Sequence, residues 1–139
     1  MAILFPFEVY TPNRIFYSGS VEAISLTLID GDGAVYAHHE AFTAPVTPCL
    51  LKIKEKDGSW KTAFTAEGIL EVKDHKTVLI SDAAEWPAEI DYERAKSAME
   101  QAQQALEMGM LKFEMDSAAS SLKRARMRIR ARNEGQKKT

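Results

Sequence analysis

The sequence predicts an α+β fold, in which an N-terminal antiparallel β-sandwich is followed by a C-terminal antiparallel two-helix hairpin. Two observations lead to this prediction. Residues 3–84 contain many short runs rich in β-branched and aromatic residues, with turn signals between them. Beyond Trp86-Pro87 the apolar residues recur every three or four positions instead. The length of 139 residues suits one small domain with an appendage, and we place the boundary between residues 1–86 and 87–139.

The first part is expected to contain short strands joined by tight turns. The runs with strand composition are FEVY, VEAISLTLI, CLLKIK, WKTAFTA, ILEV and TVLIS. WKTAFT alternates between two faces, whereas VEAISLTLI is apolar or small on both, as is typical of a strand inside a sandwich. Asp57-Gly58 predicts a hairpin turn because glycine accepts a positive φ. Residues 30–33 (DGDG) and 73–76 (KDHK) predict further reversals.

The second part carries two narrow apolar stripes, which predict the seam of an antiparallel helix pair. The stripes are Tyr92, Ala95, Met99, Ala102 and Leu106, then Ala118, Leu122, Ala125 and Ile129. We expect the reversal between Gly109 and the acidic stretch Glu114–Asp116. Alanines bury little area, at about 25 cal/mol per Å². The hairpin should therefore be marginally stable alone, which makes it a candidate moving part.

Composition narrows the functional classes only slightly. The formal net charge is −2, so the total implies no partner, but the residues from Lys123 onward are strongly basic. Cys49 is the single cysteine, which rules out an intrachain disulfide and fits a reducing compartment. No apolar run approaches the roughly 20 residues of a membrane-spanning helix.

Four segments resemble a known family when they are taken in order. They are FYSGSVEAI (16–24), GDGAVYAHH (31–39), EGILEV (67–72) and IDYERA (90–95). With the basic hairpin that follows, they make nearly the whole chain similar to the epsilon subunit of the F-type ATP synthase. The sequence departs from that family in one loop, where Ala37, His38 and Ala41 replace its proline, glycine and second proline. We therefore expect this loop to differ in shape from the corresponding loop of the family.

The resemblance implies a non-catalytic rotor subunit in the central stalk of a proton-translocating ATP synthase. In the family, the sandwich binds the gamma subunit and sits on the c-ring. The hairpin either folds back or extends into the catalytic head of alpha and beta subunits, where it inhibits ATP hydrolysis. The resemblance further implies a peripheral position at the cytoplasmic face of the inner (plasma) membrane, with no membrane span. No cofactor is required, no metal is expected, and ATP is a candidate regulatory ligand.

IDYERA has two interpretations. In the structural one, Asp91 is a helix N-cap and Arg94 pairs with a carboxylate in the same turn. In the functional one, Arg124 and Arg128 project from one face of the second helix toward Arg94, and the three guanidiniums bind an anion. Some bacterial members of the family bind ATP in this way. By resemblance, the nucleotide-binding residues here are Glu85, Ile90, Asp91, Arg94, Arg124 and Arg128.

Two further groups of residues follow from the resemblance. A loop facing the c-ring would contain Asp32, Tyr36, His38 and His39, and the inhibitory contact with the catalytic head would use Lys123, Arg126, Arg130 and Arg132. Without the resemblance, Asp32 is a turn residue, and the adjacent histidines point to opposite faces of a strand, which disfavours a metal site.

The arginine-rich second helix also permits a nucleic-acid-binding or adaptor module. The alternating arginines of residues 124–132 are expected to spread around the helix, and no aromatic residues interleave with them for base stacking. We therefore favour the rotor subunit.

Overall fold

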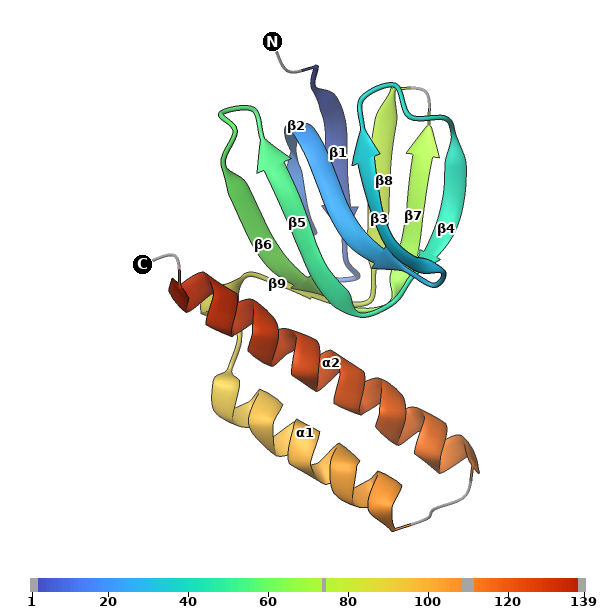
Figure 1. Ribbon diagram of the computed structural model, residues 1–139, viewed down its shortest axis with the longest axis vertical. Coiled ribbons are helices and arrows are strands. Elements are labelled where there is room, and N and C mark those ends of the chain that lie inside the picture. Colours follow the sequence, from blue (N-terminus) through green and yellow to red (C-terminus); the bar gives the residue numbers. More distant parts are fainter. Residues whose placement is uncertain (1–2, 74, 109–111, 138–139) are drawn as a thin grey trace. The chain divides into compact units, whose positions relative to one another are not determined.

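The computed structural model describes residues 3–73, 75–108 and 112–137 (Figure 1). The chain divides into two compact units, Met1–Glu85 and Trp86–Thr139. The first is a β-sandwich and the second a helical hairpin, so the predicted fold class is confirmed. The strands are β1 (Phe5–Tyr10), β2 (Ile15–Leu28), β3 (Gly31–Tyr36), β4 (Phe42–Val46), β5 (Cys49–Glu55), β6 (Trp60–Thr65), β7 (Gly68–Lys73), β8 (Lys76–Ser81) and β9 (Ala84–Glu85).

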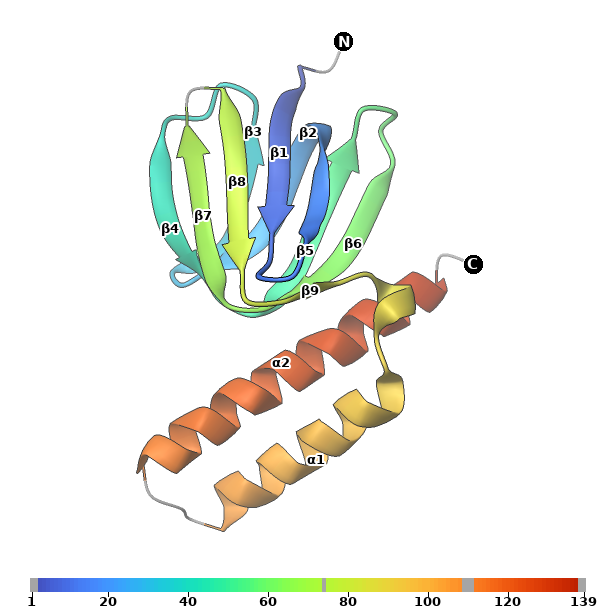
Figure 2. The ribbon, with the colours of Figure 1, turned by 180° about the vertical axis from the view of Figure 1, so that it is seen from behind.

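The long strand β2 connects the two layers of the sandwich. Its first half pairs with β1 and its second half with β3 and β5. One layer contains β1, β8, β7 and β4, which lie in front in Figure 2. The other contains β3, β5 and β6 with the second half of β2, extended by the short β9. Large side chains from both layers fill the space between them and are fully buried: Phe7, Val9, Ile24, Leu51, Ile53, Leu70 and Leu79.

The sheet is antiparallel except at one place. Strands β1 and β8 run parallel, with Phe7 opposite Thr77 and Tyr10 opposite Ile80. This parallel pair was not predicted from the sequence. The reason is that alternation along a strand shows which residues share a face, but it does not show which strand lies alongside.

Strand β3 was missed because the residues at its start are of types typical of turns. The DGDG segment was expected to be a reversal, yet Gly31, Asp32 and Gly33 all pair with β2. The turn itself is only Ile29 and Asp30, and Gly31 has a φ of 130°. The turn at Asp57-Gly58 is as predicted, with Gly58 at a φ of 86°. In the KDHK turn Lys73 pairs with Lys76, and Asp74 lies outside the described residues.

The second unit contains the short 3₁₀ helix η1 (Pro87–Glu89), α1 (Tyr92–Glu107) and α2 (Lys112–Lys137). The two α-helices pack against each other, and the buried residues include Ala95 and Ala102 of α1 and Leu122 and Ala125 of α2. The predicted apolar seam is thus present. The acidic stretch 114–116, which was expected to limit the reversal on its far side, lies near the start of α2. Gly109, the other predicted limit of the reversal, is outside the described residues.

A hydrogen-bonded tyrosine makes the stability of the sandwich depend on pH in the alkaline range. The hydroxyl of Tyr17 donates to Glu55 Oε2 at 2.9 Å. Burial, and next the hydrogen bond to Glu55, raise the pKa of Tyr17 from its ordinary value of 10 to about 12. Since the folded state favours the neutral phenol, its contribution to stability is complete below about pH 10. It is lost as the pH rises from about 10 to about 12.

We predict that a spectrophotometric titration of the folded protein will show one tyrosine ionising near pH 12. The Tyr17→Phe variant should lack this step, and Tyr36→Phe, which changes an exposed ring, should retain it. An unchanged step in Tyr17→Phe would assign the late ionisation to another residue.

Candidate functional site

The segment before α1 is held by local hydrogen bonds. The backbone N–H of Trp86 donates to Glu89 Oε1 at 2.8 Å, which fixes the turn of η1. Ile90 is buried, and the Asp91 carboxylate accepts a hydrogen bond from the backbone N–H of Arg94 at 3.1 Å. Asp91 is therefore the N-cap of α1, as the structural interpretation of IDYERA predicted.

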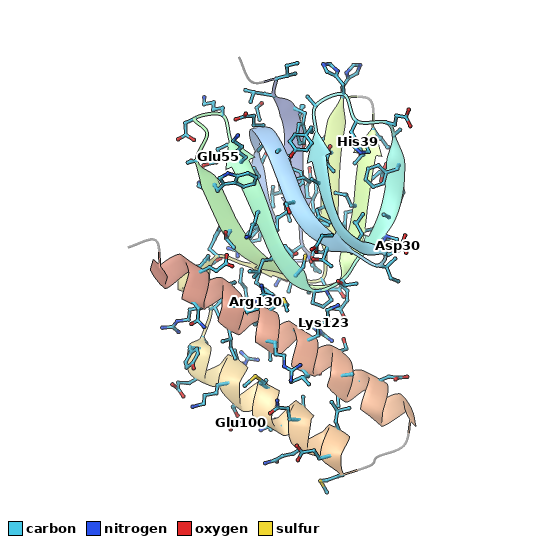
Figure 3. All side chains as sticks on the ribbon, in the orientation of Figure 1. Asp30, His39, Glu55, Glu100, Lys123 and Arg130 are labelled. Carbon is cyan, nitrogen blue, oxygen red and sulfur yellow. The ribbon has the colours of Figure 1, made fainter. Side chains whose placement is uncertain are left out.

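The basic residues of α2 form two stripes. Lys123, Arg126 and Arg130 are exposed, and Figure 3 labels the first and last of them on α2. Arg124, Arg128 and Arg132 are half-buried and are spaced by four residues, so they share a different face. We call the first set the exposed stripe and the second the half-buried stripe. The arginines thus do not form one stripe, in agreement with the expectation from their spacing, and burial separates them into these two groups.

Arg132 belongs to the half-buried stripe, whereas the other residues that the resemblance assigns to the inhibitory contact, Lys123, Arg126 and Arg130, form the exposed stripe. Its Nη1 donates to the carbonyl oxygen of Ile90 at 3.2 Å, and its guanidinium carbon lies 5.5 Å from the centre of the Tyr92 ring. Elsewhere on this stripe, Arg124 Nη2 donates to Ser120 Oγ at 3.2 Å, within the same helix.

The contacts of Arg132 also establish the register of the hairpin at this end. Because Arg132 contacts Ile90 and Tyr92, Arg128 lies one helical turn farther along, at the level of the first turn of α1. That turn carries Arg94, whose side chain is exposed. Among the six residues assigned to nucleotide binding, five thus belong to the hairpin, at or near this end, whereas Glu85 is in β9 of the sandwich unit.

The four residues assigned to a c-ring loop do not share one loop. Asp32 lies near the β2–β3 turn, where its carboxylate accepts from Thr27 Oγ1 at 2.9 Å. Tyr36, His38 and His39 lie at or beyond the other end of β3. Figure 3 shows this separation through the labels of Asp30 and His39, at opposite ends of the sandwich. A contact through Asp32 and one through the histidines would therefore use different ends of the domain.

His38 has a strained backbone. Its φ is 63°, in the left-handed region that favours glycine, and it stands where the resemblance has a glycine. Its neighbour His39 is held locally, with Nδ1 2.9 Å from the carbonyl oxygen of Glu40 and its ring 5.0 Å from that of Phe42. The loop thus has a left-handed residue at this position even though its glycine is missing.

One surface feature was not predicted. Register across β2, β1, β8, β7 and β4 places a continuous line of apolar side chains on the outer face of one layer. We call it the apolar row: Ile15, Tyr10, Ile80, Ile69 and Pro45. The isoleucines are exposed by 51–60%, whereas the alternate residues Val9, Leu79 and Leu70 are fully buried. The signal in the sequence was an isoleucine among the outward-facing residues of both β7 and β8, at Ile69 and Ile80.

The charged neighbours of the apolar row neutralise one another. Glu8 accepts hydrogen bonds from Lys76 and from the Tyr10 hydroxyl, and the pKa of Glu8 is lowered mainly by Lys76. Lys73 pairs with Glu71 at 2.7 Å on the same layer. An apolar partner surface could therefore cover the row without meeting an excess of either charge.

Two classes of site find no support within the part of the chain that the structure describes. No group of three His, Cys, Asp or Glu residues there could hold a metal ion. No helix there has both the length and the hydropathy needed to cross a membrane.

Comparison with known proteins identifies both units. Residues 4–87 match the β-sandwich domain of the ATP synthase delta/epsilon chain, and residues 88–133 match its long α-helix domain. Proteins named ATP synthase epsilon chain are 41% identical over 130 residues in Caldicellulosiruptor bescii (94% of each chain) and 42% identical over 127 residues in Caldanaerobacter subterraneus (91% of each chain). A chain of the Euglena gracilis mitochondrial ATP synthase has the same fold, with a TM-score of 0.78 at 18% identity, covering 88% of this chain and 78% of that one.

Replacing the strained histidine should stabilise the sandwich. We predict that His38→Gly raises the free energy of unfolding by about 0.5–1 kcal/mol, because glycine adopts a positive φ without steric cost. Urea denaturation measures the change. The matched control is His39→Gly, which removes the ring contact with Phe42 without relieving strain and should be destabilising. Equal effects of the two substitutions would contradict the assignment of strain to His38.

Proposed function

The chain belongs to the delta/epsilon family of ATP synthase subunits, non-catalytic components of the central stalk, and from this we propose how its surfaces are used. The sandwich docks on the gamma subunit through the apolar row and contacts the c-ring through one of its ends. The hairpin restrains ATP hydrolysis by extending into the catalytic head of alpha and beta subunits, and ATP favours its closed form. The subunit is peripheral, at the cytoplasmic face of the membrane.

The apolar row is the observation that carries the docking proposal. Three isoleucines that are each more than half exposed lie in register on neighbouring strands. A contiguous apolar surface on a soluble domain marks an interaction site, because leaving it in water is unfavourable. The layer is rigid, since the alternate residues of the same strands form the core, and so the row is presented without any cost of ordering it.

The exposed stripe supports the inhibitory role. Lys123, Arg126 and Arg130 project into solvent at intervals of three and four residues, so they form one positive face along α2. Such a face suits an acidic surface on a partner, here the alpha and beta subunits. Because the seam between the helices consists largely of alanines, opening the hairpin has a low free-energy cost. The positive face can therefore contact a partner in the extended state.

The closed hairpin supports an ATP site at its Arg132 end. Arg94 on α1 and Arg128 on α2 lie at the same level, and Arg124 follows one turn along. Guanidinium groups that converge on one anion match the geometry of phosphate. A ligand that binds only the closed form stabilises it by mass action, so inhibition should ease as ATP rises. The nucleic-acid alternative gains nothing from the relatives, which are named ATP synthase epsilon chains.

Docking on gamma can be tested on the row itself. We predict that Ile69→Thr with Ile80→Thr weakens binding to the gamma subunit of the same organism by about tenfold or more, because two half-exposed isoleucines no longer bury apolar area. Threonine keeps the strand propensity. Ile3→Thr, at an equally exposed isoleucine outside the row, is the control. Calorimetric titration with gamma measures the affinity. If the double variant binds gamma as tightly as the wild type, the interface lies elsewhere.

The two stripes of α2 should separate the two regulatory roles. We predict that ATP binds the purified protein saturably by calorimetry and that the Arg94→Ala, Arg124→Ala variant loses this binding. The Arg126→Ala, Arg130→Ala variant removes the same charge from the exposed stripe, so it should retain ATP binding. In the assembled complex, the second variant should instead relieve inhibition of ATP hydrolysis. If millimolar ATP produces no heat change, ATP does not bind here, and Arg94 and Arg124 have purely structural roles.

A further inference from the structure

We propose that Arg132 is a latch that holds the hairpin closed without any ligand. It lies near the end of α2, and both of its contacts are to the segment that leads into α1. One contact is a hydrogen bond of 3.2 Å to the carbonyl oxygen of Ile90, and the other is the stacking of its guanidinium over the Tyr92 ring. The three residues join positions that are far apart in the sequence and that separate when the hairpin opens.

The chemistry of these contacts suits a latch. The carbonyl of Ile90 precedes the N-cap, and a charged donor makes a stronger hydrogen bond to it than a neutral donor would. The Ile90 side chain is only 4% exposed, so apolar burial also holds the residue whose carbonyl Arg132 contacts. A planar guanidinium can donate in its plane to Ile90 and stack on Tyr92 through its face, which a lysine ammonium cannot do.

A second contact closes the same end of the hairpin. The last turns of α2 pack on η1, and Gly135 approaches Pro87 so closely that there is no room for a side chain. A Cβ atom on Gly135 would lie 2.9 Å from Pro87 Cγ and nearer still to Cβ. Gly135 and Arg132 are three residues apart on α2, so the glycine contact brings the helix close to the segment that Arg132 holds.

The latch has a regulatory consequence, which rests on the proposed function. Ile90 and Asp91 begin the proposed nucleotide site, and the latch orders them before any nucleotide arrives. A hairpin that is already closed by protein contacts needs less ATP to remain closed, because the ligand does not have to supply the whole free energy of closure. The latch is thus a contact of this chain that sets the threshold at which ATP controls the hairpin.

Hydrogen exchange on the full-length protein, without nucleotide, tests the latch directly. We compare Arg132→Met with Arg130→Met, which removes the same charge from the exposed stripe two residues away. Arginine and methionine have similar helix propensities, so neither substitution weakens the helix itself. Amides of residues 90–98 and 126–137 should exchange about tenfold faster in Arg132→Met, equal to about 1.4 kcal/mol of opening free energy. Arg130→Met should match the wild type.

Two further variants separate the latch from a general loss of stability. Arg132→Lys keeps the charge but loses the fork and the stacking, so its exchange should fall between wild type and Arg132→Met. Gly135→Ala should also speed exchange, against the direction of helix propensity, because the added methyl group forces α2 away from Pro87. Amides of the sandwich report global unfolding and should be unchanged in every variant.

The outcomes distinguish the latch from the ATP site. Equal exchange in Arg132→Met and Arg130→Met would overturn the latch, whatever ATP does. If ATP slows exchange in Arg132→Met but the latch effect is present without ATP, both proposals stand. If the latch effect is present and ATP at millimolar concentration changes nothing in either protein, the latch stands and the proposed nucleotide site fails.

Discussion

The smallness of the side chains between α1 and α2 is the constraint on which the hairpin depends. Ala95 and Ala102 face a seam that contains Leu122 and Ala125, and so the helices gain little from the burial of apolar area. In a helix pair with leucines throughout, polar contacts at the ends would be minor additions. Here they are comparable to the seam itself, which is why the Asp91 cap, the Arg132 contacts and the close approach of Gly135 to Pro87 decide how the unit behaves.

The sandwich has the opposite balance. Its core contains large side chains that are fully buried, such as Phe7, Ile24, Leu51 and Leu79, from both layers. A core of this kind tolerates a strained residue such as His38 and an outer face that carries exposed isoleucines. One chain thus combines a rigid unit that presents fixed surfaces with a second unit whose packed form is only weakly stabilised by its seam. This division suits the use of the two units proposed above for a subunit of the central stalk.

Sequence reasoning found the features that are local and missed those that depend on register. The apolar stripes of the helices and the cap at Asp91 depend on neighbouring positions, and both were predicted. Strand β4 was missed because Pro45 cannot donate to a ladder, although its carbonyl accepts from the Ile29 N–H at 3.2 Å. The apolar row could not be predicted, because it requires the alignment of five strands. The contacts of Arg132 with Ile90 and Tyr92 could not be predicted for a similar reason: they depend on the path of the chain into α1, which spacing along α2 does not reveal.

The parallel pairing of β1 with β8 has a consequence for how the protein is made. Phe7 lies opposite Thr77, so the N-terminal strand finds one of its neighbours only after almost the entire sandwich has left the ribosome. Contacts between such distant residues slow folding, because a long loop must be closed before they form. The hairpin is synthesised after the sandwich and has mostly local contacts, so it can form quickly once its residues emerge. During synthesis, therefore, the helical hairpin emerges when the sandwich has only just become able to close its sheet.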